Sequence, residues 1–292
     1  MRIIDLFKTD FFKNININYY FRKFFEIFFT PKCPICGLNQ ETSDVCYKCF
    51  NQIAFLNNAC VKCQEPFEYE IPGIDVCIKC SSQDCDFYGK MQCVLKYNEF
   101  AKNLIVRFKN HQDFSLAHLF AKFLGSAVNH ILLPNDNSLK QGNEFQESQK
   151  VLNDNIIIVP VPLYKKRLAW RGYNQSLILA KVLGKMYGLQ VMNILVRVKD
   201  TNSQALKTTI ERQSNVKGAF IIDDRYSQFI AGKRFVIIDD VITTGATVFE
   251  CAKVLHKNKA KSVDLIAIAR RLKRKHHESN KSIVEIRIEE KK

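Results

Sequence analysis

The sequence predicts an α/β fold, a parallel sheet with helices on both faces, preceded by a small cysteine-rich N-terminal domain. Two apolar runs, 156–161 and 235–238, are rich in β-branched residues and have the length of buried parallel strands. We expect them to be neighbouring central strands, with 191–198 and 263–268 as two further strands. The second run precedes residues 248–258, whose apolar positions recur at helical spacing. With 292 residues, the chain is long enough for this domain and a smaller one.

The first segment, residues 1–30, is predicted to be a helical extension. Its aromatic residues from Tyr20 to Phe28 recur at helical spacing, which indicates an amphipathic helix that packs on the protein itself. A role at a membrane surface is the alternative. Charged residues interrupt the segment, so it lacks the apolar core of a secretory signal, and no run of about 18 apolar residues predicts a transmembrane helix. We therefore expect a cytoplasmic protein without membrane insertion.

Residues 31–86 contain four Cys-x-x-Cys pairs, which predict a double zinc-ribbon domain. Such pairs present thiolates at tetrahedral geometry, as structural zinc requires. Disulfides are the alternative, but they are typical of secreted chains. We expect two zinc ions, held either by consecutive pairs or in an interleaved cross-brace, and a domain that cannot fold without them. Cys85, Cys93 and Cys251 fit no such spacing and are predicted to be buried thiols. The predicted ligands are Cys33, Cys36, Cys46, Cys49, Cys60, Cys63, Cys77 and Cys80.

The remaining residues, 87–292, form the predicted α/β domain. Two helical patterns within residues 87–125 are joined around residues 110–113. The segment 134–155 is polar and almost free of aromatic residues, which predicts a mobile insert. The tail, 270–292, combines a basic run with alternating apolar residues that predict a short edge strand.

A basic loop with a glycine follows the first predicted strand. Open α/β sheets bind ligands at the carboxyl ends of their strands, so we expect an anion there. A second polar cluster, between the two predicted strands, has the composition of a lid that closes on charged substrate. A solvated basic turn is the alternative for the loop. The residues expected to hold a pyrophosphate are Lys166, Arg167 and Arg171, with Asn174 and Gln175 beside them, and Arg197, Lys199 and Gln204 of the lid.

The most specific pattern is VIIDDVITTGATV, at residues 236–248. A buried strand stops at the acidic pair Asp239 and Asp240, and a short hydroxyl-rich loop around one glycine leads into a helix. Backbone N–H groups at such a helix N-terminus bind phosphate, and the acids lie where the hydroxyls of an attached sugar would be. The loop residues that we expect to bind the phosphate are Thr243, Thr244, Gly245, Ala246 and Thr247.

This pattern resembles the PRPP-binding motif of type I phosphoribosyltransferases, in which the acidic pair grips the ribose 2′- and 3′-hydroxyls. Neither a Walker A loop nor a GxGxxG motif is present. The cysteine pairs are followed by VPVPL, KKR and RGYNQ, then by R-x-K-x-T-x-x-Q and R-x-x-N-V-x-G-A-F, before this motif. In that order, over roughly residues 25–270, the chain resembles the ComF (ComFC-like) family of competence-associated phosphoribosyltransferase-like proteins.

The resemblance implies a type I phosphoribosyltransferase-like sheet in a cytoplasmic bacterial protein. It implies a role in natural transformation on incoming single-stranded DNA, with a helicase partner. It also implies that PRPP binds with Mg²⁺ and that Asp239 and Asp240 are the catalytic residues. No base or amine pocket can be recognised in the sequence, so the acceptor of a phosphoribosyl transfer stays open. The alternative is a catalytically inactive DNA-binding adaptor that keeps the PRPP pocket as a sensor or a relic.

Charge supports a polyanionic partner. The formal net charge is +15 at pH 7, which favours polyanions through counterion release. Aromatic residues near basic ones, such as Trp170 and Tyr173, could stack on the exposed bases of single-stranded DNA. The alternative is that these lysines and arginines form a solvated face. A zinc-dependent transcription factor is disfavoured, because no helix-turn-helix pattern accompanies the cysteine pairs.

Overall fold

The computed structural model describes the greater part of the chain, namely residues 31–41, 44–67, 69, 72–82, 89–110, 112–132, 156–201 and 216–271. The predictions for residues 1–30, 134–155 and 272–292, and for Cys85 and Gln204, concern residues outside these ranges. Within them, no helix combines the length and the apolar character needed to cross a membrane.

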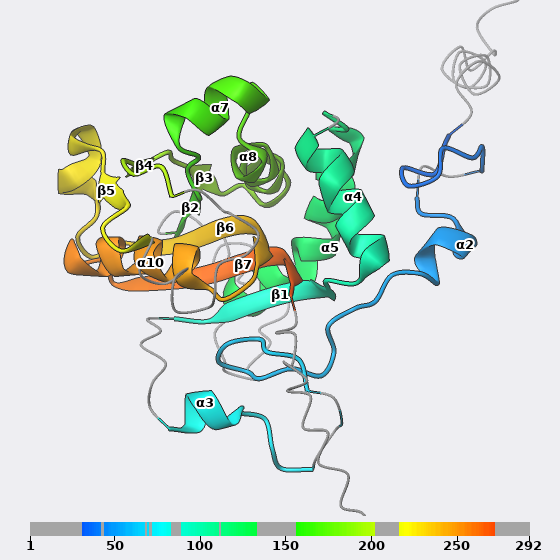
Figure 1. Ribbon diagram of the computed structural model, residues 1–292, viewed down its shortest axis with the longest axis horizontal. Helices are drawn as coiled ribbons and strands as arrows, with labels where there is room; N and C mark the ends of the chain where they lie inside the picture. Colours follow the sequence, from blue (N-terminus) through cyan, green and yellow to red (C-terminus); the bar gives the residue numbers. More distant parts are fainter. Residues whose placement is uncertain are drawn as a thin grey trace, which may run out of the picture.

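A five-stranded, all-parallel sheet forms the centre of the protein (Figure 1). Its strand order is β1-β7-β6-β2-β3. The two runs predicted to be neighbouring central strands are β2 and β6, and they are hydrogen-bonded neighbours, with Ile158 opposite Val236. The bounds are β1 Met91–Lys96, β2 Ile156–Pro160, β3 Gln190–Val191, β6 Arg234–Ile242 and β7 Ser262–Arg270.

Helices cover both faces of the sheet, as predicted. Side chains alternate along β2, so Ile158 packs into the apolar cluster of α4, α5 and α8, whereas Ile157 packs into the cluster of α10. Full burial of one such side chain contributes about 1.5–3 kcal/mol, so these two layers hold the sheet together. The bounds are α4 Glu99–Asn110, α5 Ser115–Leu132, α7 Lys165–Arg171, α8 Gln175–Tyr187 and α10 Ala246–Lys257.

The predicted strand at 191–198 is wrong beyond Val191. The ladder of β3 ends where the N–H of Met192 donates to the carbonyl of Ile158 (3.0 Å). The chain then leaves the main sheet, and β4 (Leu195–Arg197) pairs antiparallel with β5 (Phe220–Ile222) in a separate two-stranded sheet. A short 3₁₀ helix, η3 (Asp224–Phe229), leads from there towards β6.

Three further elements differ from the sequence prediction. The edge strand β1 lies in a stretch that was predicted to be helical only. The basic loop after β2 is largely the short helix α7. The acidic pair does not end its strand, because β6 continues pairing with β7 as far as Ile242, with Asp239 opposite Ala267. Asp239 and Asp240 therefore lie near the end of β6 but still within it, where backbone hydrogen bonds to β7 hold the strand on one side.

The two cysteine-rich parts lie apart along the sheet edge, as the positions of α2 (Tyr47–Phe50) and α3 (Ile78–Ser81) in Figure 1 show. Each of these one-turn helices begins directly after a cysteine, Cys46 or Cys77. Each thereby brings the last two cysteines of its cluster onto one side of a tight turn. The helical prediction on either side of residues 110–113 is confirmed by α4 and α5.

Candidate functional site

The acidic pair lies at the carboxyl end of the sheet, next to the end of β2. The Ser176 hydroxyl and the Asp240 N–H donate to Oδ1 of Asp239, at 3.1 and 2.9 Å. Burial and the charge of Asp240 raise the pKa of Asp239 to about 7, although Lys109 and the two hydrogen bonds oppose the rise. The Asp239 carboxyl is therefore half ionised near neutral pH, and a bound cation or hydroxyl would favour its ionised form.

Asp240 is almost fully buried, with 3% of the residue exposed. Its counter-ion is Lys109, near the end of α4, whose Nζ lies 2.7 Å from Oδ1. The other carboxylate oxygen, Oδ2, accepts no hydrogen bond from the described residues. Lys109 was not predicted from the sequence, because a lysine in the last turn of an amphipathic helix is common and carries no local signal.

The phosphate loop joins β6 to α10 immediately after the acids. Gly245 has φ +84°, a conformation that favours glycine, and a Cβ there would lie 2.3 Å from the Phe249 ring. The N-cap residue of α10, Gly245, supplies no side-chain acceptor, so backbone N–H groups beyond that of Ala246 can bind an external anion. The hydroxyl of Thr244 accepts from the N–H of Ala246 (3.3 Å), and Thr243 and Thr247 are half-buried beside it.

Two of the predicted arginines, Arg171 and Arg197, approach the acidic pair, and Arg167 lies near both of them. Burial and the nearby Arg167 lower the pKa of Arg171, whereas Asp240 raises it. Burial and Arg167 likewise lower the pKa of Arg197, whereas Asp239 is among the groups that raise it. The Nε atoms of Arg171 and Arg197 are buried and make no hydrogen bond with the described residues. The fold thus brings guanidinium groups together and leaves the Nε donors of Arg171 and Arg197 without a hydrogen-bond acceptor among the described residues.

The other predicted donors lie in different surroundings. Lys166 is exposed on α7, and Lys199 donates to the carbonyl of Lys217 (3.0 Å). Asn174 caps α8: its Oδ1 accepts from Ser176 and Leu177, and its Nδ2 donates to the carbonyl of Val161 (3.0 Å). Gln175 is buried and accepts from Arg171 (2.6 Å). These last two side chains position α8 and Arg171.

The eight predicted zinc ligands form two groups of four, each made of consecutive pairs, which excludes the cross-brace. Cys33, Cys36, Cys46 and Cys49 form cluster 1, and Cys60, Cys63, Cys77 and Cys80 form cluster 2, with the sulfurs of each cluster within 4.8 Å of one another. The closest sulfurs are 3.7 Å apart in cluster 1 and 3.6 Å apart in cluster 2. Tetrahedral Zn–S bonds of about 2.3 Å require about 3.8 Å, so both clusters fit zinc.

Electrostatics does not separate the ligands from the other cysteines, because burial also raises the pKa of the ligand Cys63, to about 12. Burial raises the pKa of the Cys33 thiol, but hydrogen bonds from the Cys46, Cys36 and Ile35 N–H groups outweigh it and lower the pKa to about 6. Burial raises the pKa of Cys93 to about 12 and that of Cys251 well above its usual range. The prediction that Cys93 and Cys251 are buried thiols is confirmed.

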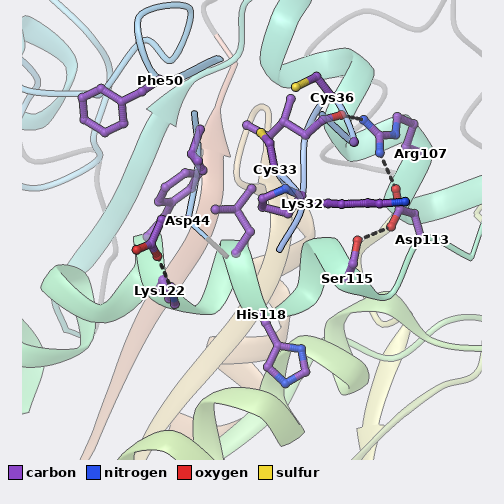
Figure 2. Close-up of a pocket in the computed structure, with 16 residues that line it drawn as sticks. Lys32, Cys33, Cys36, Asp44, Phe50, Arg107, Asp113, Ser115, His118 and Lys122 are labelled. Carbon is purple, nitrogen blue, oxygen red and sulfur yellow. Dashed lines mark hydrogen bonds and ion pairs between the residues drawn. The ribbon is translucent and has the colours of Figure 1, made fainter. Parts of the chain in front are cut away.

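A cavity of about 1150 Å³ lies between cluster 1 and helices α4 and α5 (Figure 2). Its charged groups are engaged in the fold: Arg107 donates to the carbonyl of Ile35 (2.6 Å) and to Asp113 (2.5 Å). Lys122 pairs with Asp44 at 2.9 Å. None of the predicted PRPP-binding residues that the structure describes lines this cavity.

Comparison with known families identifies both halves of the chain. Residues 24–83 match the double zinc ribbon domain, and residues 176–291 match the phosphoribosyl transferase domain. Competence protein F of Haemophilus influenzae is 29% identical over 246 residues, which cover 83% of this chain and 98% of that protein.

Two further relatives extend the comparison. Competence protein ComFC of Streptococcus pneumoniae is 27% identical over 256 residues, covering 82% of this chain and 100% of that protein. The DNA utilization protein YhgH of Escherichia coli K12 is 36% identical over 116 residues, covering 39% of this chain and 49% of that protein.

Proposed function

Because this chain is a homologue of the ComF and ComFC competence proteins, with a phosphoribosyl transferase domain and a double zinc ribbon, we propose that it binds PRPP with Mg²⁺ and acts in DNA uptake. The observation that carries the proposal is that three features lie together at the carboxyl end of the sheet. These are the acidic pair, the N-terminus of α10 after the glycine turn, and the cluster of Arg167, Arg171 and Arg197. We propose the cytoplasm as its location.

Each part of PRPP has complementary residues in this arrangement. Asp239 and Asp240 would hold the ribose hydroxyls, and loop residues 243–247 would bind the 5′-phosphate. Arg167, Arg171 and Arg197 would bind the pyrophosphate, with Lys166 of α7 and the lid residues Lys199 and Gln204 as further donors. Mg²⁺, when bound, would supply positive charge between the pyrophosphate and the ribose, since it prefers phosphate oxygens and few protein ligands.

The same residues suit phosphoribosyl transfer, which we propose as the activity, to an acceptor of unassigned identity. Pyrophosphate departs from C1 with the bonding electron pair, and the acceptor atom forms the new bond to C1. The two carboxylates stabilise the positive charge that develops on the ribose. The arginines stabilise the leaving pyrophosphate, an effect that grows when the lid excludes water. No covalent nucleophile from the protein is needed.

Calorimetry with PRPP and Mg²⁺ on the zinc-replete protein tests this proposal. We expect micromolar binding by the wild type and a loss of at least about 100-fold in the Asp239→Asn/Asp240→Asn double variant, because the ribose loses both negatively charged acceptors. Asp224→Asn, at an exposed acid of η3, is the matched control and should bind as the wild type does. Absence of binding by the wild type would reject the proposal and favour the adaptor.

A DNA contact is the second candidate, and helix α7 favours it. No residue of this helix is fully buried, only Arg171 at its end is half-buried, and Trp170 is 77% exposed. Lys165, Lys166 and Arg167 lie exposed on the same helix. An exposed aromatic ring beside several cations is the combination that binds single-stranded nucleic acid, the ring by stacking and the cations by releasing counterions.

Fluorescence anisotropy with a labelled oligothymidylate tests the DNA contact. Trp170→Ala combined with Lys165→Gln and Lys166→Gln should weaken binding by about tenfold or more, because one stacked base is worth about 1–3 kcal/mol. The salt dependence should also become shallower. Lys181→Gln with Lys185→Gln, which removes two exposed charges from α8, is the control. Equal affinities in the two variants would refute a site on α7.

A further inference from the structure

The side chain of Arg270 joins three distant parts of the chain. Arg270 ends β7 and is 3% exposed. Its guanidinium donates through Nη1 to the carbonyls of Ile242 (3.2 Å) and Thr243, where the phosphate loop begins. Through Nη2 it donates to Oε2 of Glu65 (2.9 Å), two residues after the cluster 2 ligand Cys63. One buried cation thus connects cluster 2 to the loop.

Cluster 2 holds Glu65 in place through its own turn. The N–H of Cys60 donates to the carbonyl of Glu65 (2.9 Å), and the N–H of Gln64 donates to the carbonyl of Cys60 (2.8 Å). Gln64 has φ +55° and is buried, and its side chain accepts from the N–H of Cys93 on β1 (3.4 Å). The turn that supplies a zinc ligand is therefore fastened to the sheet at two neighbouring residues.

The geometry of the peptide group carries this restraint into the loop. A trans peptide is planar, so its C=O and N–H point in opposite directions. When Arg270 fixes the carbonyls of Ile242 and Thr243 on one side, the N–H groups of Thr243 and Thr244 are fixed on the other side. These N–H groups belong to the loop expected to receive the phosphate. The Arg271 N–H also holds the Ile242 carbonyl (2.9 Å), so it is the direction of the Thr244 N–H that depends on the guanidinium held by Glu65.

Cluster 1 makes no such connection within the described residues. Its links to the α/β domain run to α4 and α5, through Arg107 with the carbonyl of Ile35 and through the exposed pair of Asp44 and Lys122. The two clusters thus have the same ligands but different neighbours. This difference supplies an internal control for any effect of cluster 2 on the loop.

We propose that cluster 2, when it holds zinc, positions the phosphate loop through Glu65 and Arg270 and so raises its affinity for a phosphorylated sugar. The identity of the ligand as a phosphorylated sugar rests on the proposed function, whereas the ordering of the loop by Glu65 and Arg270 does not. Glu65 and Arg270 are positioning residues that need not touch the ligand. Loss of Glu65 leaves Arg270 buried without its carboxylate, so the guanidinium moves towards water and releases the carbonyl of Thr243, whereas the Ile242 carbonyl stays bonded to the Arg271 N–H (2.9 Å).

Hydrogen exchange on the ligand-free, zinc-replete protein tests the proposal without PRPP. In Glu65→Gln we expect amides of residues 243–247 to exchange about tenfold faster, while amides of residues 235–238 exchange as in the wild type. Arg270→Lys keeps the charge but cannot reach both carbonyls and Glu65, and it should give the same local increase. Asp44→Asn is the control, with no increase expected. Zinc analysis should find two ions per chain in all four proteins.

The affinity for PRPP with Mg²⁺ provides the second readout. We expect its dissociation constant to rise about tenfold in Glu65→Gln and to stay unchanged in Asp44→Asn. Unchanged loop exchange in both Glu65→Gln and Arg270→Lys would overturn the proposal. If no protein binds PRPP but the loop still loosens in these two variants, the positioning role stands and the proposed function fails.

Discussion

Chelation of zinc is expected to unfold residues 31–82 while the parallel sheet stays folded. The reason is the small apolar core of this segment, in which Ile78 is 89% exposed and Tyr47 is also exposed. Most of its buried side chains are the cysteines themselves, among them Cys33, Cys60 and Cys80. Structural zinc contributes about 10–16 kcal/mol in small metal-dependent domains, more than such a segment can supply by burial. Limited proteolysis, followed by mass spectrometry, measures the loss of structure segment by segment.

Substitutions of single cysteines sharpen this test. Cys46→Ser should reduce the zinc content from two ions to one and expose the segment around cluster 1. Cys93→Ala, at a buried thiol that belongs to neither cluster, should retain two ions and wild-type protection. Protection of residues 31–82 that persists after complete removal of zinc would show that packing alone supports the domain.

Affinity for PRPP with Mg²⁺ is expected to rise between pH 6 and pH 8, while the free energy of unfolding falls. Both follow from Asp239, whose pKa is raised from 3.8 to about 7 by burial and by Asp240. A raised pKa means that the folded protein favours the protonated carboxyl. Its stabilising contribution is complete below pH 3.8 and is lost as the pH rises through about 7. Ligand binding needs the ionised carboxylate, so affinity should change in the opposite sense.

The Asp239→Asn variant separates the two effects. It should unfold with a free energy that depends less on pH, and it should be more stable than the wild type at pH 8 by on the order of 1–2 kcal/mol. Its residual affinity for PRPP should lack the rise attributed to Asp239. Denaturant unfolding and calorimetry at pH 6, 7 and 8 measure both quantities. Identical pH profiles for the wild type and the variant would exclude Asp239 as the titrating group.

Local patterns made much of this protein predictable. The zinc ligands follow from spacing within a few residues, and β2, β6 and α10 follow from apolar runs and periodicity. β1 was missed because Met91–Lys96 runs directly into the apolar pattern of α4, and α7 was missed because its side chains face solvent and show no apolar stripe. Such elements are defined by their neighbours rather than by their own residues.

The contacts of the candidate site were harder to predict for the same reason. The ion pair of Lys109 with Asp240 and that of Glu65 with Arg270 join residues far apart in the sequence. A single chain carries no sign that a lysine or a glutamate will meet a particular partner after folding. Only the sheet order, which places β7 beside both β6 and β1, brings Arg270 next to the phosphate loop.

Helix α7 has a consequence for how proteins of this kind can diversify. A helix in which no residue is fully buried adds little to the stability of the fold, so most substitutions on it carry little energetic penalty. Evolution can therefore exchange the exposed Trp170 and Lys165 with little of the loss of stability that usually limits change near a binding site. Substitutions on the exposed face of α7 could therefore change which polyanion this helix prefers, while the sheet, the cysteine clusters and the acidic pair remain the same.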